Sequence, residues 1–189
     1  MKSLRRGIHS FTLIEILVVI TIIGLLAGIS VPAVGGALSS ARKAKAMTMA
    51  NQIRTAMVQF HTEYGFFPTN GMNTRGIGTT GPALARVLIG STNATNDNPR
   101  RIVFLEVPAD FTSGGGGDPE SGGIMTSRDL YKRGSLKNRQ VNYSLSVDND
   151  YDSRTWVTNN LAETNVSGSC HVWIRDPSDP DRKTVGTWK

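Results

Sequence analysis

The sequence predicts an α+β protein in which one long N-terminal helix packs against a small antiparallel sheet with long loops. An apolar run covers residues 11–34, a helical amphipathic pattern extends it to about residue 64, and short alternating segments follow residue 140. A helical region followed by a run of strands is typical of the α+β class. The 189 residues suffice for one ordinary domain plus a membrane anchor.

The first element is the stretch "HSFTLIEILVVITIIGLLAGISVPAV", residues 9–34. Its apolar part, about 24 residues, is longer than the roughly 20 that a helix needs to cross the hydrocarbon core of a membrane. A secretory signal has an apolar core of only about 7–15 residues, so residues 11–34 are predicted to span a membrane. Lys2, Arg5 and Arg6 precede this segment, and such cations hold its amino end in the cytoplasm.

The net charge of +6 is concentrated at the two ends of the membrane segment. Arg42, Lys43 and Lys45 follow it closely, and the rest of the chain is near neutral. A nucleic-acid site needs a clustered basic face elsewhere, so binding to nucleic acid is not expected. The single cysteine, Cys170, excludes an intramolecular disulfide and argues against cysteine-based metal sites.

After Pro32 and a Gly-Gly pair, the apolar run becomes amphipathic. Apolar residues recur every three or four positions, which predicts one buried helix face made of Ala46, Met49, Ala50, Ile53, Met57, Phe60 and Tyr64. The helix is then expected to end at Gly65, with Pro68 shortly after it. The simplest account is one helix from about residue 12 to residue 64, about 80 Å long at roughly 1.5 Å per residue. Pro32 should bend or loosen it.

The N-terminal sequence resembles that of type IV pilins and of the pseudopilins of type II secretion systems. In that family a dedicated prepilin peptidase cuts a short basic leader before a phenylalanine, which is then N-methylated. The resemblance implies that residues 1–10 are the leader and that the cut falls between Ser10 and Phe11. Serine takes the place of the glycine that nearly always precedes the cut, and it is similarly small. In this family a glutamate is the fifth residue after the cut, which is Glu15 if the cut precedes Phe11. A cut after Gly7 would make Glu15 the eighth residue, three positions out of place.

The resemblance also assigns roles inside the membrane segment. Glu15 becomes the fifth residue of the mature chain, and its carboxylate is expected to meet the Phe11 amine of a neighbouring subunit. An ion pair is tolerated in a low dielectric, whereas a lone charge there is costly. The alternative is a chance polar residue near the membrane interface. Gly24 and Pro32 fall where the family has a glycine and a helix-bending proline, so Glu15 and Pro32 are the predicted assembly residues.

An extracytoplasmic domain is predicted over residues 66–189, after the long helix of residues 11–65. Within it, "TTGPALARVLIG", residues 79–90, predicts a short helix with Pro82 in its first turn. "RIVFLEV", residues 101–107, predicts a buried segment, helical or extended. The next loop contains six glycines and predicts a flexible surface segment, residues 112–123. Strands are predicted at residues 141–147, 154–158 and 169–174.

Two acidic clusters are candidate calcium sites, although plain turns are the simpler interpretation of both. The first comprises Asp148, Asp150 and Asp152, and the second comprises Asp176, Asp179 and Asp181. Calcium takes 6–8 oxygen ligands, which alternating aspartates in a turn can present. Neither cluster has the glycine at position six or the glutamate at position twelve of an EF-hand loop. The resemblance favours a site, because major pseudopilins bind calcium in a C-terminal loop. Aspartate is also common in ordinary turns.

An enzyme is not predicted, because Cys170 and His171 are adjacent and would point to opposite faces of a strand. The resemblance instead implies a structural pseudopilin in the bacterial inner membrane, with its C-terminal domain in the periplasm, that polymerises into a type II secretion pseudopilus. The implied partners are identical subunits, minor pseudopilins, the prepilin peptidase and an inner-membrane assembly platform. The alternatives are a type IV pilus or competence pilin, which usually ends in a disulfide-bounded region, and a membrane-anchored exported binding module.

Overall fold

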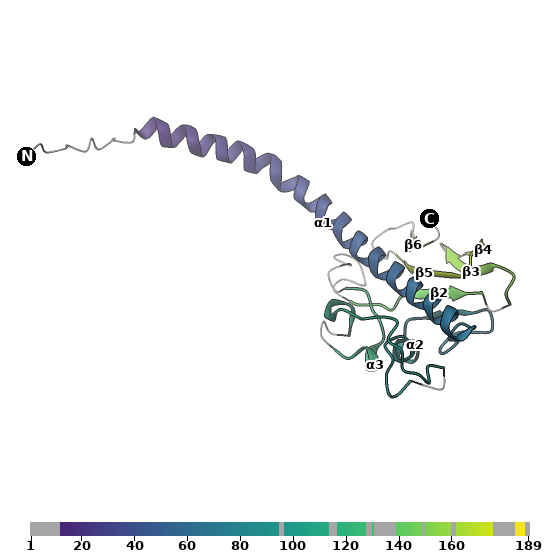
Figure 1. Ribbon diagram of the computed structural model, residues 1–189. Coiled ribbons are helices and arrows are strands. Elements are labelled where there is room, and N and C mark those ends of the chain that lie inside the picture. The colour runs from purple at the N-terminus through teal and green to yellow at the C-terminus, as the bar shows by residue number, and fades with distance from the viewer. Residues whose placement is uncertain are drawn as a thin grey trace, which may run out of the picture. The chain divides into compact units, whose positions relative to one another are not determined.

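The computed structural model of the chain describes residues 12–94, 97–113, 117–127, 130, 139–148, 150–159, 162–175 and 184–187. The chain divides into two compact units, Met1–Ala41 and Arg42–Lys189. Helix α1, Leu13–Tyr64, contributes to both units (Figure 1). Its bounds confirm the predicted long helix, which continues through Pro32 without interruption.

In the second unit, the described residues form two short helices and six strands beside the last part of α1 (Figure 1). The helices are α2 (Pro82–Leu88) and α3 (Pro119–Gly122), with a 3-10 turn η1 (Ala109–Phe111) between them. One antiparallel sheet has the order β1-β2-β5-β6, formed by Ile77–Thr79, Ser144–Val147, Cys170–Arg175 and Thr184–Gly186. A second sheet pairs β3 (Arg154–Asn159) with β4 (Ala162–Ser167). The α+β prediction is confirmed.

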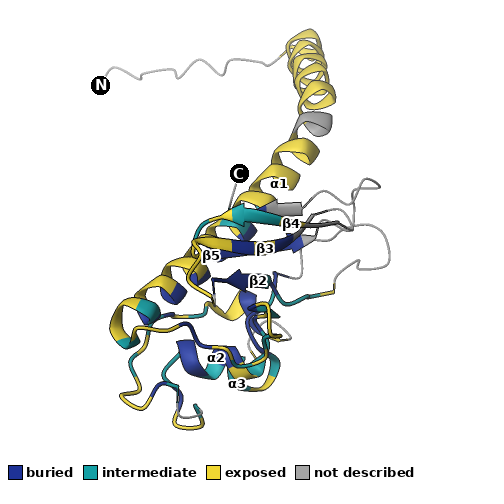
Figure 2. Ribbon diagram, turned by 90° about the vertical axis from the view of Figure 1, so that its right-hand side faces the viewer, coloured by how far each residue is buried: buried dark blue, intermediate teal, exposed yellow. Residues whose placement is uncertain are grey.

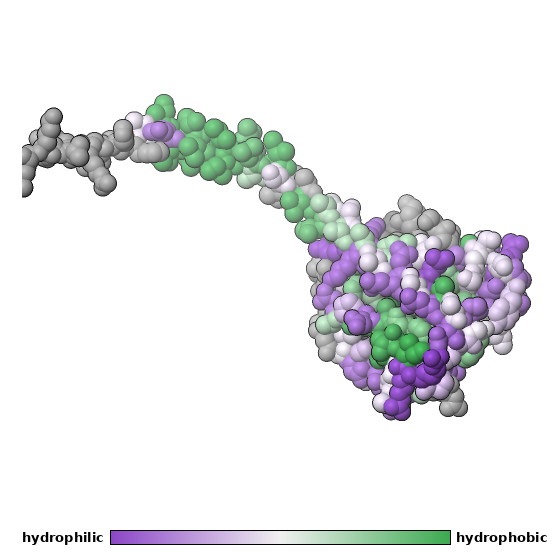
Figure 3. Space-filling view, viewed as in Figure 1, coloured by the Kyte–Doolittle hydropathy of each residue, from purple (hydrophilic) through white to green (hydrophobic). Residues whose placement is uncertain are grey.

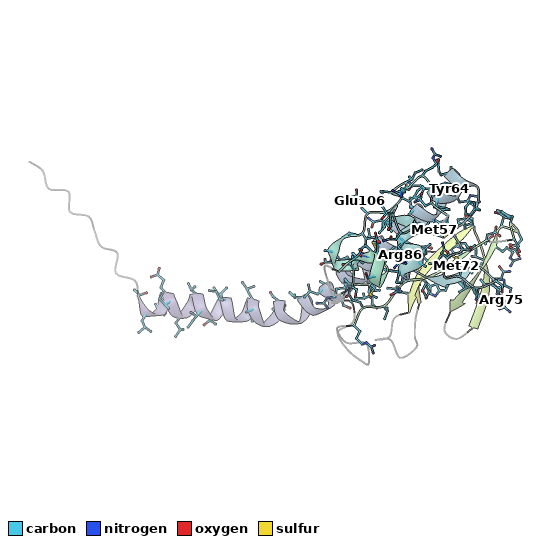
Figure 4. All side chains as sticks on the ribbon, turned by 90° about the horizontal axis from the view of Figure 1, so that it is seen from below. Met57, Tyr64, Met72, Arg75, Arg86 and Glu106 are labelled. Carbon is cyan, nitrogen blue, oxygen red and sulfur yellow. The ribbon has the colours of Figure 1, made fainter. Side chains whose placement is uncertain are left out.

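The core of the second unit forms between the apolar face of α1, the larger sheet and α2. The predicted helix positions from Ala46 to Phe60 are all at most 2% exposed, whereas Tyr64 is half-buried. The hydroxyl of the fully buried Tyr143 donates a hydrogen bond to the Ala46 carbonyl at 3.2 Å. Figure 2 shows that most of β2 and α2 is buried. Figure 4 labels Met57, a core residue of α1, and Met72, which packs against the core.

The segment predicted to be buried at residues 101–107 is irregular and mostly not enclosed. Only Leu105 is fully buried in it, and Val103 is 58% exposed. The N–H groups of Phe104 and Leu105 both donate to the carbonyl of Leu88 at the end of α2. The prediction of a buried segment is therefore confirmed only in part, for Leu105 in the core and for Phe104 and Val107 packed against it, because an apolar run without a period does not say which side chains face inward.

Two other predictions need correction. The strand predicted at residues 141–147 begins only at Ser144, and Ser146 is as fully buried as its apolar neighbours. Strand β3, from the second sheet, lies in contact with β2, and the sequence pattern of β2 does not contain this neighbour. The glycine-rich segment at residues 112–123 contains the one-turn helix α3, which Asp118 caps by accepting a hydrogen bond from the Glu120 N–H at 2.8 Å.

Replacing Ile53 by alanine should destabilise the second unit by about 2–5 kcal/mol, because the fully buried side chain leaves a cavity behind. Val58, which is 37% exposed on the same helix, is the matched control. Its replacement by alanine should change the free energy of unfolding by only about 0.5 kcal/mol. Urea unfolding of the full chain in detergent, followed by tryptophan fluorescence, measures both. Equal losses in the two variants would contradict this packing of α1.

Candidate assembly segment and metal site

The first half of α1 is a continuous apolar surface. The segment Leu13–Ser30 has a mean hydropathy of 2.6, and none of it is buried. Figure 3 shows the hydrophobic residues that gather along this part of the helix. By length and composition it could cross a membrane, and it is the single such span among the described residues. Backbone groups satisfied within a helix and apolar side chains on every side suit lipid or neighbouring helices.

Glu15 lies in the first turn of α1, three residues after Thr12. This Thr-x-x-Glu spacing is that of a capping box, in which the glutamate reaches back to the residue that begins the helix. The N–H and the hydroxyl of Thr12 both lie 3.5 Å from Oε2 of Glu15, and the Glu15 N–H donates to the Thr12 carbonyl at 3.1 Å. Within one subunit Glu15 thus acts as a helix cap. The predicted processing residues, Ser10 and Phe11, lie outside the described residues, so the pairing of Glu15 with a neighbouring Phe11 stays a prediction.

Four glycines lie within the first half of α1, each at a cost of about 1 kcal/mol relative to alanine. A Cβ added at Gly24, Gly28, Gly35 or Gly36 would meet nothing within 4 Å, so packing inside the subunit does not require them. At about 100° per residue, Gly24, Gly28 and Gly35 lie within about 40° of one another around the helix axis. Small residues on one face allow membrane helices to approach closely. Pro32 lies between two of them and has no N–H to donate to Gly28.

The loop between β2 and β3 brings together three of the predicted metal ligands. One carboxylate oxygen from each of Asp148, Asp150 and Asp152 lies within 4.8 Å of the other two. Asp150 and Asp152 are exposed, whereas Asp148 is only 6% exposed. Oδ2 of Asp148 accepts a hydrogen bond from the Ser153 N–H at 2.9 Å, and Oδ1 of Asp152 accepts one from the Arg154 N–H at 2.8 Å. The second predicted cluster lies outside the described residues: Asp176, Asp179 and Asp181.

The backbone of this loop adopts a turn that the sequence did not predict. Tyr151 has φ 60° and Ser153 has φ 64°, in the left-handed region that residues other than glycine seldom occupy. Ser153 is the sixth residue counted from Asp148, where an EF-hand loop places glycine for its sharp turn. The absence of glycine at position 153 predicts no such turn, yet Ser153 adopts the left-handed conformation. The residue type at position 153 therefore does not reveal the turn.

Cys170 and His171 do not form a catalytic pair. They are adjacent on β5 and both are buried. Burial raises the pKa of the Cys170 thiol to about 12, so the nucleophilic thiolate is nearly absent at neutral pH. Desolvation lowers the pKa of His171, whose Nε2 lies 3.0 Å from the Ser167 carbonyl oxygen. Both side chains therefore belong to the interior of the sheet.

Comparison with known proteins identifies the N-terminal segment. The prokaryotic N-terminal methylation motif matches residues 5–31, which include the predicted cleavage site and Glu15. The chain carries the N-terminal segment of a pilin-like protein. The type IV major pilin protein PilE1 of Neisseria gonorrhoeae is 33% identical over 70 residues, which are 37% of this chain and 31% of that protein. The type IV major fimbrial protein FimA of Dichelobacter nodosus is 40% identical over 57 residues, 30% of this chain and 35% of that protein.

A fimbrial protein of Neisseria meningitidis serogroup B is 31% identical over 80 residues, 42% of this chain and 45% of that protein. The pilin-like chain thus spans less than half the length of each of these three relatives. No solved structure matches it. The relatives are structural pilin subunits rather than enzymes, and the resemblance to pilin-like proteins is confirmed.

The pilin-like chain should resist thiol labelling while it is folded. Iodoacetamide should modify Cys170 at pH 7.5 at least ~10-fold more slowly in the full chain in detergent than in urea, because burial keeps the thiol protonated. The folded state holds this proton more tightly than the unfolded chain does. Stability should therefore fall as the pH rises above the unfolded thiol pKa of about 8.5. Rapid labelling of the native chain at pH 7.5 would show that β5 is open to solvent.

Proposed function

We propose that this pilin-like chain is a structural subunit that polymerises into a filament at the bacterial inner membrane through residues 11–34. The observation that carries the proposal is the fully exposed apolar first half of α1. Such a helix is stable in lipid before assembly and among identical helices afterwards. The face that contains Gly24, Gly28 and Gly35 supports close packing between neighbouring helices, because nothing inside the subunit uses the space beside it.

Assembly would begin with hydrolysis of the Ser10–Phe11 peptide bond by the prepilin peptidase. Water is consumed, and a free amine is left on Phe11. Methylation then transfers a methyl group from a methyl donor to this nitrogen, with release of a proton, and the amine keeps its positive charge. The carboxylate of Glu15 in one subunit would pair with this amine in the next. In a low dielectric each of these charges is costly without the other, so the pair would set the register between neighbouring helices.

Among filaments of this kind we favour the pseudopilus of a type II secretion system, assembled with minor pseudopilins on an inner-membrane platform, with the second unit in the periplasm. The single cysteine supports this, because Cys170 is buried on β5 and no disulfide can enclose a C-terminal region. A type IV pilus subunit is the second candidate, favoured by the names of the relatives. Blocked protein export on deletion of the chain would assign it to a pseudopilus, and its presence in sheared surface fibres to a pilus.

The mature chain should begin with N-methylated Phe11. Mass spectrometry of the N-terminal peptide from purified membranes measures both the cleavage and the methyl group. Ser10→Gly is the matched variant and should be processed at least as fast, because glycine is the usual residue before the cut in the family. A mature chain that keeps Met1, or one that is cut near residue 38 after the apolar run, would contradict the filament proposal.

Charge and capping at Glu15 can be separated by substitution. Glutamine also serves at the third position of a capping box, so Glu15→Gln keeps the cap and removes the charge. We expect Glu15→Gln to insert and be processed but to yield at least ~10-fold fewer filaments by electron microscopy, and Glu15→Lys to yield none. If Glu15→Gln assembles normally and Glu15→Ala does not, capping alone explains the residue and the proposed pairing is wrong.

A further inference from the structure

We propose that Asn70 is a site of spontaneous deamidation and that Asp97 controls how fast it reacts. The inference is independent of the filament role, because it rests on the second unit alone. Deamidation converts a side-chain amide into a carboxylate, and it starts with attack by the backbone nitrogen of the next residue. Asn70 is the single asparagine of the sequence that precedes a glycine, and glycine has no side chain to hinder that attack.

The Asn70–Gly71 pair lies at the tip of a turn in the loop that follows α1. The Met72 N–H donates to the Thr69 carbonyl at 2.9 Å, which closes a four-residue turn around the pair. Gly71 is exposed and has φ 78°, a value typical of the third position of a type II turn. A Cβ added to Gly71 would meet nothing within 4 Å, so packing does not hold the tip in place. Figure 4 labels Tyr64 and Met72, which flank the loop.

Asp97 holds the side chain that has to react. Nδ2 of Asn70 donates a hydrogen bond to Oδ2 of Asp97, which lies in the loop after α2. A hydrogen bond to a carboxylate is stronger than one to a neutral acceptor. This bond fixes the amide on Asp97, and donation to an anion pushes electron density onto the amide, which makes Cγ of Asn70 less open to attack. The folded chain should therefore react more slowly than the unfolded chain.

The reaction needs only the chain and water. The Gly71 nitrogen forms a bond to Cγ of Asn70, and the amide nitrogen leaves with the Gly71 proton as ammonia. A water molecule then opens the cyclic imide at either of its carbonyl groups. One opening leaves aspartate at position 70. The other leaves isoaspartate, in which the main chain runs through Cγ and is longer by one carbon atom.

Both products break the contact with Asp97. A carboxylate at position 70 has no proton to donate, and it lies within hydrogen-bond distance of a like charge, which is unfavourable. Isoaspartate also lengthens the main chain inside the turn, so the hydrogen bond from Met72 to Thr69 cannot keep its geometry. Deamidation should therefore detach the loop after α1 from the loop after α2.

The effect should stay local, because the end of α1 is tied to the same neighbouring loop at other points. The Tyr64 hydroxyl donates to Oδ1 of Asn98 at 2.7 Å, and Arg100 forms an ion pair with Glu63. Neither contact involves position 70. The modified chain should therefore remain folded, with one segment loosened and its net charge lower by one.

Incubation of the full chain in detergent at pH 7.5, with mass spectrometry of the tryptic peptide of residues 55–75, tests the site. Asn73 lies in the same peptide and is the internal control, because threonine follows it and its Oδ1 accepts from the N–H groups of Arg75 and Ile77, both at 3.0 Å. We expect Asn70 alone to be converted, at least ~5-fold more slowly in the folded chain than in urea. Asp97→Ala should remove most of this difference, and Asp97→Asn, which can still accept the hydrogen bond, only part of it.

Three results would overturn the proposal. The first is an Asn70 that stays intact in Asp97→Ala although it reacts in urea. The second is a parent chain that reacts as fast as Asp97→Ala, and the third is an Asn73 that reacts as fast as Asn70.

A variant that mimics the product tests the consequence without Asp97→Ala. Asn70→Asp should lower the melting temperature by about 2–4 °C. Adding Asp97→Asn should restore it, because that asparagine can donate to the new carboxylate, with the two partners exchanged. Asn73→Asp is the matched control: it adds the same charge to the same loop and keeps its acceptor oxygen, so it should leave the melting temperature unchanged. Equal losses in Asn70→Asp and Asn73→Asp, or a double variant no more stable than Asn70→Asp, would contradict the role of Asp97.

Discussion

One continuous helix has to satisfy two different surroundings. Between Ala46 and Phe60, one face of α1 is enclosed by the rest of the second unit, whereas between Leu13 and Ser30 every face is apolar and none is buried. Backbone hydrogen bonds within the helix hold both halves equally, so only the side chains distinguish them. The architecture of the second unit follows from the need to cover the first face. The second surface must be covered from outside the subunit, by lipid or by other helices.

The first half of α1 is locally unfavourable as a helix in several places. Glycine costs about 1 kcal/mol per position and an interior proline about 3 kcal/mol, yet Gly24, Gly28, Pro32 and Gly35 all lie within it. Such conflicts between local preference and fold are expected at functional positions. Glu15 needs more care, because its capping contacts with Thr12 already explain an acid in the first turn. Capping alone does not explain a charged residue beside a long apolar surface, where glutamine would cap as well.

The sequence predicts best where a pattern repeats over many turns. The bounds of α1 and its buried positions follow from spacing alone, and Pro82 marks the start of α2. Strands β1 and β6 have three residues each, too few to show alternation. Strand β4 is polar and exists through its pairing with β3, in which Trp156 lies opposite Asn165. Such elements depend on tertiary contacts that no local pattern contains.

The sequence shows the spacing of the candidate metal ligands. It does not show the backbone conformation of the loop or the burial of Asp148. The left-handed conformation at Ser153 is a property of the backbone, so the absence of glycine could not exclude it. The Asp148 N–H donates to the carbonyl of Ser169, which comes much later in the chain, so no local pattern contains the surroundings of Asp148. A turn that needs only to reverse the chain uses one carboxylate oxygen, here Oδ2 of Asp148, which accepts a hydrogen bond from the Ser153 N–H. The other carboxylate oxygen can then stay in water. The enclosure of the second oxygen is a property of the tertiary fold, which the spacing of the aspartates does not contain.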